Sequence, residues 1–489
     1  MRPLEIVLVV GAVLMVLAWA TRRRLPAFVP LALAAVAIVH LLLEGHRVVM
    51  WPLYLGIAIS VLGVAFRDQR PGPPRRFGWR SVVRGLVAVL LLLFVLLPAL
   101  WPVMRLPAPT GPYRVGTSWL VVTDSSRAER FGPAGAVREV PVKVWYPADS
   151  ASGPPAPYAD PREMTGGMMP VLLFGQARYI KTHSYSNVPV AAGEERFPVL
   201  IFSHGFGAYA AQNTPQMEEL ASQGYVVFSI AHPGEASWAP FPDGRGVPFD
   251  SGLQKQLASM VGDKSAIAKI EALMARIADA KTPETRRESL RAFLEFSPEP
   301  LRSESVAEWA ADTRALVDRL EVINAGSVGS PLRGRLDLDR LGVFGMSYGG
   351  ATAGEFCSVD PRCKAAVNMD GGQYGRLIDG SIAVPFLILA AEPNHSIHVP
   401  VLDLATGPTY LATVPATTHI GLTDMTLMAP ILFRYAGVTG RLSPDRREAI
   451  MTAYLLGFFD QYLRGKPSPL LAEGSDAFPE VTLIRRNVP

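Results

Sequence analysis

The stretch from Gly345 to Gly349 has the form Gly-x-Ser-x-Gly and places a serine, Ser347, between two glycines. An apolar run, Leu341 to Phe344, leads into it and small residues follow it, so the expected order is strand, tight turn and helix. In a nucleophile elbow the serine lies on a strained turn, and the glycines let strand and helix approach closely. We therefore interpret Ser347 as a candidate nucleophile with its hydroxyl directed at solvent.

A serine hydroxyl becomes an effective nucleophile when a base takes its proton and an acid orients that base. In α/β-hydrolases these groups follow in the order serine, acid, histidine. Three histidines follow Ser347, and His419 is the predicted base because it comes just after the last predicted core strand, Tyr410 to Val414. His395 and His398 lie in a proline-flanked segment and are expected to be solvated loop residues, and no neighbouring cysteine or histidine cluster indicates zinc.

Two carboxylates are candidates for the acid. Asp370 follows the predicted strand Ala365 to Met369, and Glu392 follows the next one, Val384 to Ala390. The carboxyl ends of parallel strands meet at one edge of a sheet, so either side chain could reach His419. Composition does not decide between them.

Acyl transfer also requires hydrogen-bond donors directed at the developing oxyanion. In elbow geometry the backbone N–H of the residue after the serine, Tyr348, supplies one of them. A second glycine-rich turn, His204 to Gly207, follows the strand-like run Phe197 to Ser203. We predict that the Phe206 N–H in this turn is the second donor.

These candidates must be positioned by a sheet. From Phe197 to Leu463, short apolar runs alternate with helical patterns, which indicates an α/β protein whose mostly parallel sheet carries helices on both faces. Tyr113 to Thr123 and Val137 to Pro147 predict an antiparallel entry to that sheet. Residues 148–195 permit no assignment of elements. Helical patterns interrupt the alternation over about residues 231–302, and we interpret this stretch as a helical cap insertion.

The beginning of the 489-residue chain has a different composition. Four apolar segments stand out there: Ile6 to Ala20, Leu25 to Leu43, Val48 to Phe66, and Val82 to Met104. Each is about long enough to cross a hydrocarbon core of about 30 Å as a helix. The sequence therefore predicts a four-helix transmembrane region over residues 1–104, followed by an α/β-hydrolase domain over residues 105–489.

Arginines predict the orientation of these helices. The first and third connecting loops carry most of them, namely Arg22, Arg23, Arg24, Arg67, Arg70, Arg75, Arg76 and Arg80. Positively charged loops face the cytoplasm, so the catalytic domain of this multi-pass integral membrane protein is expected on the extracytoplasmic side.

Disulfides persist in such a compartment, and Cys357 and Cys363 could be bridged or remain buried thiols. The net charge of +4 reflects this topology, and no basic face interleaved with aromatic residues indicates nucleic acid.

Four separated motifs resemble the platelet-activating factor acetylhydrolase family of α/β-hydrolases. They are Phe202 to Ala208, Gly345 to Thr352, Cys363 to Gly371, and Thr418 with His419, in the family's order. The resemblance extends from about Tyr113 to Leu463. It implies Ser347 as nucleophile, His419 as base and the Phe206 backbone as an oxyanion donor. It also implies Asp370 as the acid in preference to Glu392.

The resemblance also implies a reaction, since family members remove short or oxidised acyl groups from phospholipids without a metal. The expected function is a serine-dependent carboxylic ester hydrolase acting, without cofactor or metal, on phospholipid-like or other lipophilic short-acyl esters at a bilayer. Asp250 to Arg302 could form an apolar lid over such a substrate. Alternatives are acyl transfer or polyester cleavage by the same residues, or a non-catalytic membrane-anchored binding module.

Overall fold

The computed structural model describes residues 1–23, 25–65, 79–166, 170–192, 196–260, 264–296, 304–326, 330–472 and 476–488. Its contacts divide the chain into two units. The first comprises Met1–Met104, Pro170–Tyr179 and Met428–Leu432, and the second comprises Arg105–Met169, Ile180–Leu427 and Phe433–Pro489. The domain division predicted after residue 104 falls at the end of the first segment, whereas the two short later segments in the helical unit were not anticipated.

The first unit is built from four apolar helices, which are α1 (Pro3–Ala20), α2 (Phe28–Leu43), α3 (Trp51–Ala65) and α4 (Trp79–Leu100). Within the described residues, two stretches, Pro3–Ala20 and Val82–Leu100, are long and apolar enough to cross a membrane, while Phe28–Leu43 and Val48–Val64 are shorter. Four full spans were predicted, and the structure supports two of them by length. Arg24 and the loop arginines between 66 and 78 lie outside the described residues.

Buried polar contacts explain why Pro170–Tyr179 belongs to the helical unit. Arg47 is 2% exposed. Its Nε donates to Glu5 Oε1 at 2.7 Å, and its Nη1 donates to Gln176 Oε1 at 2.8 Å. The Arg2 guanidinium lies over the Tyr179 ring, 4.5 Å from its centroid. Because a buried charge is costly unless it is paired, these partners hold the segment 170–179 against α1 and the connection before α3.

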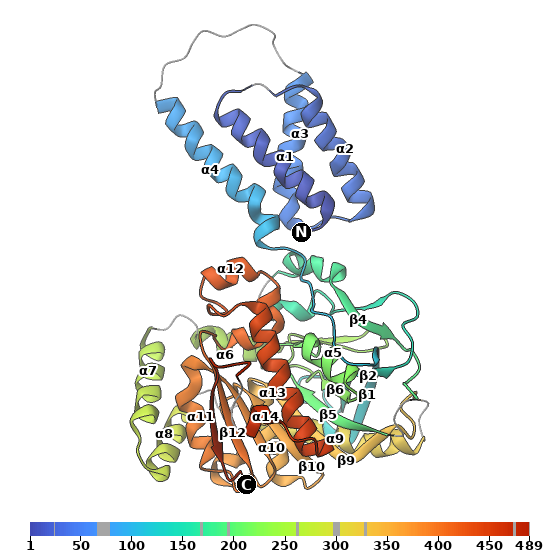
Figure 1. Ribbon diagram of the computed structural model, residues 1–489, viewed down its shortest axis with the longest axis vertical. Coiled ribbons are helices and arrows are strands. Elements are labelled where there is room, and N and C mark those ends of the chain that lie inside the picture. The colour runs from blue at the N-terminus through green and yellow to red at the C-terminus, as the bar shows by residue number, and fades with distance from the viewer. Residues whose placement is uncertain are drawn as a thin grey trace. The chain divides into compact units, whose positions relative to one another are not determined.

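The second unit contains a sheet with the strand order β13-β12-β11-β10-β9-β5-β6-β2-β1-β4-β3 (Figure 1). The strands are β1 (Arg114–Ala128), β2 (Val137–Ala148), β3 (Pro155–Pro157), β4 (Lys181–Ser186), β5 (Phe197–Ser203), β6 (Val226–Ile230), β9 (Leu336–Met346), β10 (Cys363–Met369), β11 (Phe386–Ala391), β12 (Thr409–Val414) and β13 (Thr482–Arg486). All neighbours from β6 to β12 pair in parallel, and β1, β2 and β6 pair antiparallel. The prediction of a mostly parallel sheet with an antiparallel entry is confirmed. β3, β4 and the antiparallel edge strand β13 were missed.

Helices cover both faces of this sheet. On one face α5 (Thr214–Ser222) and α13 (Pro444–Arg464) enclose an apolar core with β5, β9 and β10. On the other face α9 (Ser305–Ala325), α10 (Tyr348–Val359) and α11 (His395–Leu402) enclose a second core. Ser443 caps α13, since its side chain accepts a hydrogen bond from the Arg446 N–H.

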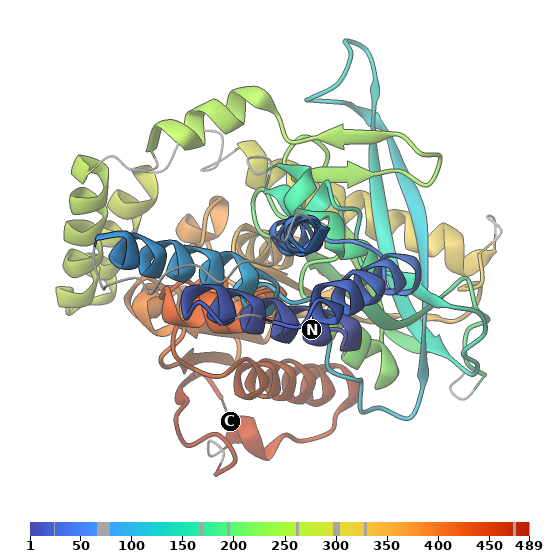
Figure 2. The ribbon, with the colours of Figure 1, turned by 90° about the horizontal axis from the view of Figure 1, so that it is seen from above.

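The predicted insertion is largely helical. It contains a hairpin of β7 (Trp238–Pro240) and β8 (Gly246–Pro248), followed by α6 (Ser251–Met260), α7 (Lys264–Asp279) and α8 (Pro283–Glu295). The pair α7 and α8 packs against α11, at the opposite side of the second unit from the long β1–β2 hairpin (Figure 2). Residues 261–263 and 297–303 of the insertion lie outside the described residues. Its role as a cap stays a prediction.

The two cysteines are joined by a disulfide bond between Cys357, in the last turn of α10, and Cys363, at the start of β10. Sequence reasoning had left a bridge and free thiols as alternatives. The bond closes the connection between the elbow helix and the strand that ends at Asp370.

Candidate active site

Ser347 lies between β9 and α10, with φ 55° and ψ −119°. A positive φ is costly for a residue with a side chain, and such strain is typical of functional turns. The turn is crowded on both sides, because a Cβ on Gly345 would overlap the Gly349 backbone, and one on Gly349 would overlap the Ser203 carbonyl. The two glycines are therefore required for β9, β5 and α10 to approach closely, as the elbow pattern predicted.

Ser347, His419 and Asp370 are brought together at the carboxyl ends of their strands. The distance from His419 Nε2 to Ser347 Oγ is 2.8 Å, and that from His419 Nδ1 to Asp370 Oδ2 is 2.7 Å. The His419 side chain is 37% exposed, whereas that of Asp370 is fully buried. The imidazole can thus meet a substrate on one side and a desolvated carboxylate on the other.

Asp370 accepts three further hydrogen bonds. Its Oδ1 receives the Ala391 N–H at 2.9 Å and lies 3.1 Å from His398 Nε2, and its Oδ2 receives Asn394 Nδ2 at 2.7 Å. Burial alone would raise the pKa of Asp370, but the hydrogen bonds from His398 and His419 lower that pKa to about 2. The carboxylate is therefore ionised at neutral pH, so His419 Nδ1 carries a proton toward it and His419 Nε2 is the acceptor for the Ser347 hydroxyl.

The second candidate acid lies elsewhere. Glu392 begins the short 3-10 helix after β11, and its Oε2 accepts the Ala416 N–H at 2.9 Å. That contact ties two surface loops together. Of the two carboxylates that composition could not separate, the structure places Asp370 against His419.

The prediction for His398 was wrong. His398 lies in α11 and is fully buried. Its Nε2 can donate to the Asp370 carboxylate, which is also buried and has little access to water. His395 is partly buried in the same helix, with its Nδ1 2.7 Å from Thr413 Oγ1. Sequence reasoning missed His398 and Asn394 as partners of Asp370. A usable signal was their position directly after β11, the neighbour of the strand that ends at Asp370.

The predicted oxyanion residues flank the serine. A Cβ on Gly205 would lie 3.4 Å from the Ser347 Cβ, which places the Gly205–Phe206 peptide beside the nucleophile. Tyr348 is the first residue of α10, and its ring lies 5.4 Å from that of Phe206, edge to face. In the part of the chain that the structure describes, no group of three or more potential metal ligands occurs.

Two carboxyl groups outside the serine site are fully or almost fully buried, namely Asp424 in the segment that follows His419 and Glu448 in α13. Tyr158 donates its hydroxyl proton to Asp424 Oδ2 at 2.6 Å, and Gln216 Nε2 donates to Glu448 Oε2. Burial raises the pKa of Asp424 to about 6 and the pKa of Glu448 to about 8. Glu448 therefore keeps its proton at neutral pH.

Glu448→Gln is expected to weaken the pH dependence of stability. Between the ordinary glutamate pKa of 4.5 and about 8, the folded chain holds a proton at Glu448 that the unfolded chain has lost, so the free energy of unfolding falls as the pH rises through this window. Glutamine resembles the protonated acid and does not titrate. The variant should match wild type near pH 5 and exceed its unfolding free energy near pH 8.5 by about 1–3 kcal/mol.

Thermal unfolding of the full chain at both pH values measures this difference. Glu271→Gln, at an exposed position on α7, is the matched control and should follow wild type. Parallel stability curves for wild type and Glu448→Gln would contradict the assignment of a raised pKa to Glu448.

A serine on a strand-to-helix elbow, within a mostly parallel sheet covered on both faces, defines an α/β-hydrolase. The model of the family "Platelet-activating factor acetylhydrolase, isoform II" matches residues 100–243. The platelet-activating factor acetylhydrolase of Cavia porcellus is 22% identical over 367 residues, covering 73% of this chain and 78% of its own. That of Gallus gallus is 21% identical over 388 residues, covering 73% and 84%.

A solved structure extends these similarities. The ferulic acid esterase from Streptomyces cinnamoneus is 27% identical and superposes with a TM-score of 0.60, covering 78% of this chain and all of the esterase chain. These similarities support a platelet-activating factor acetylhydrolase-like α/β-hydrolase. It is a serine-type carboxylic ester hydrolase, as its motifs predicted.

Proposed function

We propose that Ser347, His419 and Asp370 are the catalytic triad of this hydrolase. The Ser347 Oγ attacks the ester carbonyl carbon while His419 Nε2 takes the hydroxyl proton, and the carbonyl oxygen becomes an oxyanion. As the tetrahedral intermediate collapses, the C–O bond to the alcohol breaks and His419 returns the proton to the leaving alkoxide. Water then adds to the acyl-serine with His419 again as base, which releases the carboxylic acid and restores the serine.

The observation that carries this proposal is the pair of contacts made by His419, at 2.8 Å to the Ser347 Oγ and 2.7 Å to the Asp370 Oδ2. These distances suit proton transfer without rearrangement. The ionised Asp370 stabilises the imidazolium that forms as Ser347 loses its proton. The N–H groups of Phe206 and Tyr348 are the proposed oxyanion donors, since both lie beside Ser347.

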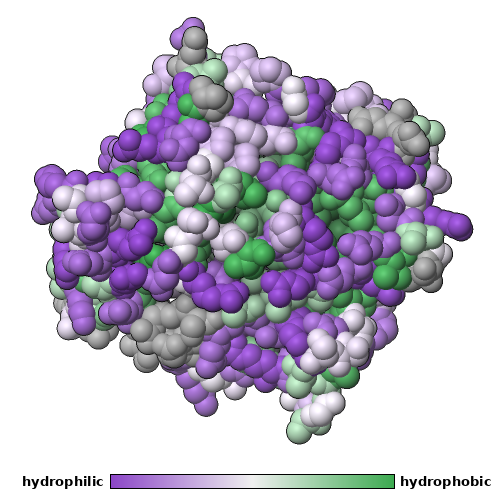
Figure 3. Space-filling model, turned by 90° about the horizontal axis from the view of Figure 1, so that it is seen from below, coloured by the Kyte–Doolittle hydropathy of each residue, from purple (hydrophilic) through white to green (hydrophobic). Residues whose placement is uncertain are grey.

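The proposed substrates are phospholipid-like or other lipophilic short-acyl esters presented at a bilayer, with the insertion 250–302 as a lid. The relatives named as acetylhydrolases of platelet-activating factor favour such esters. The helical unit favours a bilayer, because less than a quarter of the apolar window in Pro3–Ala20 or in Val82–Leu100 is buried. By contrast, the face of the second unit seen in Figure 3 is mostly hydrophilic.

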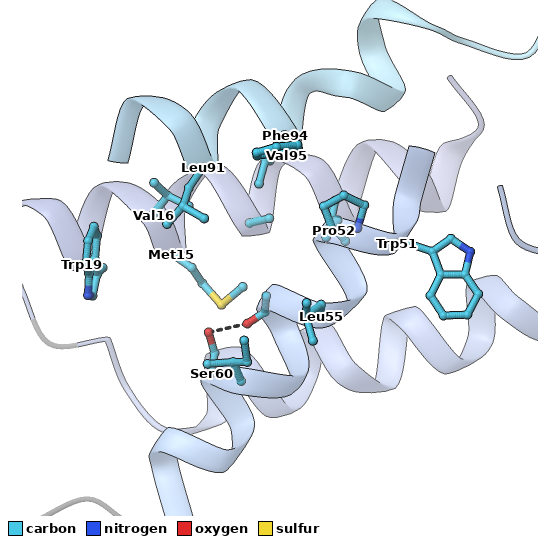
Figure 4. Close-up of a pocket in the computed structure, with 14 residues that line it drawn as sticks. Met15, Val16, Trp19, Trp51, Pro52, Leu55, Ser60, Leu91, Phe94 and Val95 are labelled. Carbon is cyan, nitrogen blue, oxygen red and sulfur yellow. Dashed lines mark hydrogen bonds between the residues drawn. The ribbon is translucent and has the colours of Figure 1, made fainter. Parts of the chain in front are cut away.

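A groove in the helical unit also suits a lipid environment. It has a volume of about 700 Å³ and runs between α1, α3 and α4, with Met15, Leu55 and Phe94 among its lining residues (Figure 4). Ser60 donates its hydroxyl proton to the Gly56 carbonyl at 2.8 Å, which leaves the lining apolar. Exposed apolar walls of this kind are stable in hydrocarbon and costly in water.

All four apolar helices are proposed to cross the membrane, so that the catalytic unit lies outside the cytoplasm as a part of a multi-pass protein. The arginine bias of the loops and the Cys357–Cys363 disulfide, which suits an oxidising compartment, favour this orientation. Reporter fusions at the C-terminus test it. A periplasm-active reporter should be active and a cytoplasm-dependent one silent, and the opposite result would reverse the topology.

The substrate proposal is tested with the purified full chain in vesicles. A phosphatidylcholine with a short sn-2 acyl chain should be cleaved to free acid and lysolipid, whereas transfer of the acyl group to an added alcohol would favour an acyltransferase. Hydrolysis of soluble short-chain esters without cleavage of any lipid ester would rule out the lipid substrate class and leave the triad proposal standing.

A further inference from the structure

A second serine–histidine–aspartate chain lies beneath the oxyanion turn and takes no part in the chemistry described above. Ser203, His232 and Asp312 are each at most 1% exposed. His232 Nε2 lies 3.1 Å from Ser203 Oγ, and its Nδ1 lies 2.9 Å from Asp312 Oδ2. Because these groups are closed off from solvent, they cannot reach a substrate, and their role must be exerted through the residues that they contact.

The charges in this chain determine its protonation. Burial opposes ionisation of Asp312, but Arg138 donates to its Oδ2 at 2.7 Å and holds the pKa of that carboxyl well below its ordinary value. Burial lowers the pKa of His232 to about 4, so this ring is neutral. Its single proton therefore lies on Nδ1 toward the Asp312 carboxylate, and its Nε2 accepts from the Ser203 hydroxyl.

His232 in turn orients His204, the first residue of the oxyanion turn. The His232 backbone N–H donates to His204 Nε2 at 3.3 Å, so the proton of the His204 ring lies on Nδ1. Burial lowers the pKa of His204 to about 3, which keeps the ring neutral. Trp309 stacks on His232 with ring centroids 3.8 Å apart and meets the His204 ring edge to face at 5.0 Å, which holds both imidazoles in place.

The His204 proton is directed at the peptide that carries the proposed oxyanion donor. His204 Nδ1 lies 2.7 Å from the Gly205 carbonyl oxygen, which also accepts the Ala208 N–H at 2.9 Å. In a trans peptide the C=O and the following N–H point in opposite directions. Holding the Gly205 carbonyl inward therefore turns the Phe206 N–H outward, and among the described residues no acceptor engages that N–H.

We propose that His204 is a positioning residue for ester hydrolysis, because its Nδ1 proton holds the Gly205 carbonyl and thereby directs the Phe206 N–H at the oxyanion. The chain Asp312–His232 fixes the orientation of His204. This inference rests on the proposed role of Ser347 and Phe206 described above. An oxyanion donor is effective only when it is oriented before the charge develops, so misorientation should reduce the rate of the chemical step more than it reduces substrate binding.

Two amide variants separate the two nitrogens of His204. In His204→Asn, the side-chain Nδ2 takes the place of the ring Nδ1 and can still donate to the Gly205 carbonyl. In His204→Gln, the amide takes the place of Nε2, so the contact with the His232 N–H is kept and the donor to Gly205 is lost. Each variant therefore loses one hydrogen bond of the pair and keeps the other.

The expected result is that His204→Asn keeps kcat for 4-nitrophenyl acetate within about 3-fold of wild type, whereas His204→Gln lowers kcat by about 10²-fold with little change in KM. A thionoester provides a second readout, because sulfur accepts hydrogen bonds weakly. The ratio of ester to thionoester hydrolysis should fall by about 10-fold in His204→Gln and stay at the wild-type value in His204→Asn. This ratio does not depend on how much of a preparation is folded.

Equal ester-to-thionoester ratios in the two variants would overturn the positioning role of His204. Ser347→Ala distinguishes this outcome from failure of the proposed function. Loss of hydrolysis in Ser347→Ala together with equal ratios would sink only the inference about His204, whereas retained hydrolysis in Ser347→Ala would sink the catalytic proposal itself.

Discussion

Ser347→Ala is expected to abolish ester hydrolysis, with kcat falling by about 10⁶-fold. The physical reason is that Ser347 Oγ forms the bond to the acyl carbon, and alanine offers no nucleophile at a position that His419 can activate. Since the backbone at Ser347 has a positive φ, alanine inherits the same strain and the elbow geometry should survive. Hydrolysis of 4-nitrophenyl acetate and labelling by a fluorophosphonate probe measure the loss.

Ser358→Ala is the matched control for this experiment. Ser358 lies on the same helix, α10, and donates its hydroxyl proton to the Glu355 carbonyl at 2.8 Å. That variant should hydrolyse esters and take up the probe as wild type does. Labelling that persists in Ser347→Ala would show that another residue reacts, and the absence of labelling and hydrolysis in wild type would favour a binding module.

Asp370→Asn is expected to lower kcat by about 10⁴-fold. An amide at this position presents a donor where His419 Nδ1 needs an acceptor, which favours the imidazole tautomer whose Nε2 cannot take the Ser347 proton. The loss should appear mainly in kcat, because Asp370 is buried and does not face a bound ester. Steady-state kinetics with a soluble ester measure it.

Glu392→Gln is the matched comparison, since Glu392 was the alternative acid. Its carboxylate accepts the Ala416 N–H, a contact that the glutamine carbonyl oxygen can keep. Activity within about 3-fold of wild type is expected, because the hydrogen bonds of the His419 ring in the described structure go to Ser347 and Asp370, and none goes to Glu392. Comparable activity in Asp370→Asn and wild type would refute the assignment of the acid.

The elbow shows how far local sequence can define a site. The form Gly-x-Ser-x-Gly after an apolar run predicts a tight strand-to-helix turn. Only glycine fits at Gly345 and Gly349, since a side chain at either position would collide with neighbouring backbone. Strand positions were also predictable from local sequence. Apolar runs reflect the burial of short segments, and β5 was placed to the residue, at Phe197–Ser203.

The apolar helices at the beginning of the chain were harder to interpret from sequence. Hydropathy marks four apolar segments, but the lengths of the described helices make only two of them clear candidates for spans. The attachment of Pro170–Tyr179 to the helical unit was not predictable from hydropathy, because it depends on contacts between distant residues, such as that of the buried Arg47 with Gln176 across 129 positions.

The sequence by itself determined the nucleophile candidate, the order of serine, acid and histidine, the parallel sheet and the class of reaction, because each of these follows from patterns within a few residues. The motifs' resemblance to a family already favoured Asp370 over Glu392, and the structure places Asp370 against His419. Tertiary structure alone decided that His398 is a buried partner of that carboxylate, and that Ser203, His232 and Asp312 lie beneath the turn His204 to Gly207. Such partners depend on which strands are neighbours in the sheet and on where the connecting loops place their side chains. Local periodicity predicts neither of these. A buried charge or polar group must nevertheless find a partner, so the fold that satisfies all of them at once selects among alternatives that composition leaves equal.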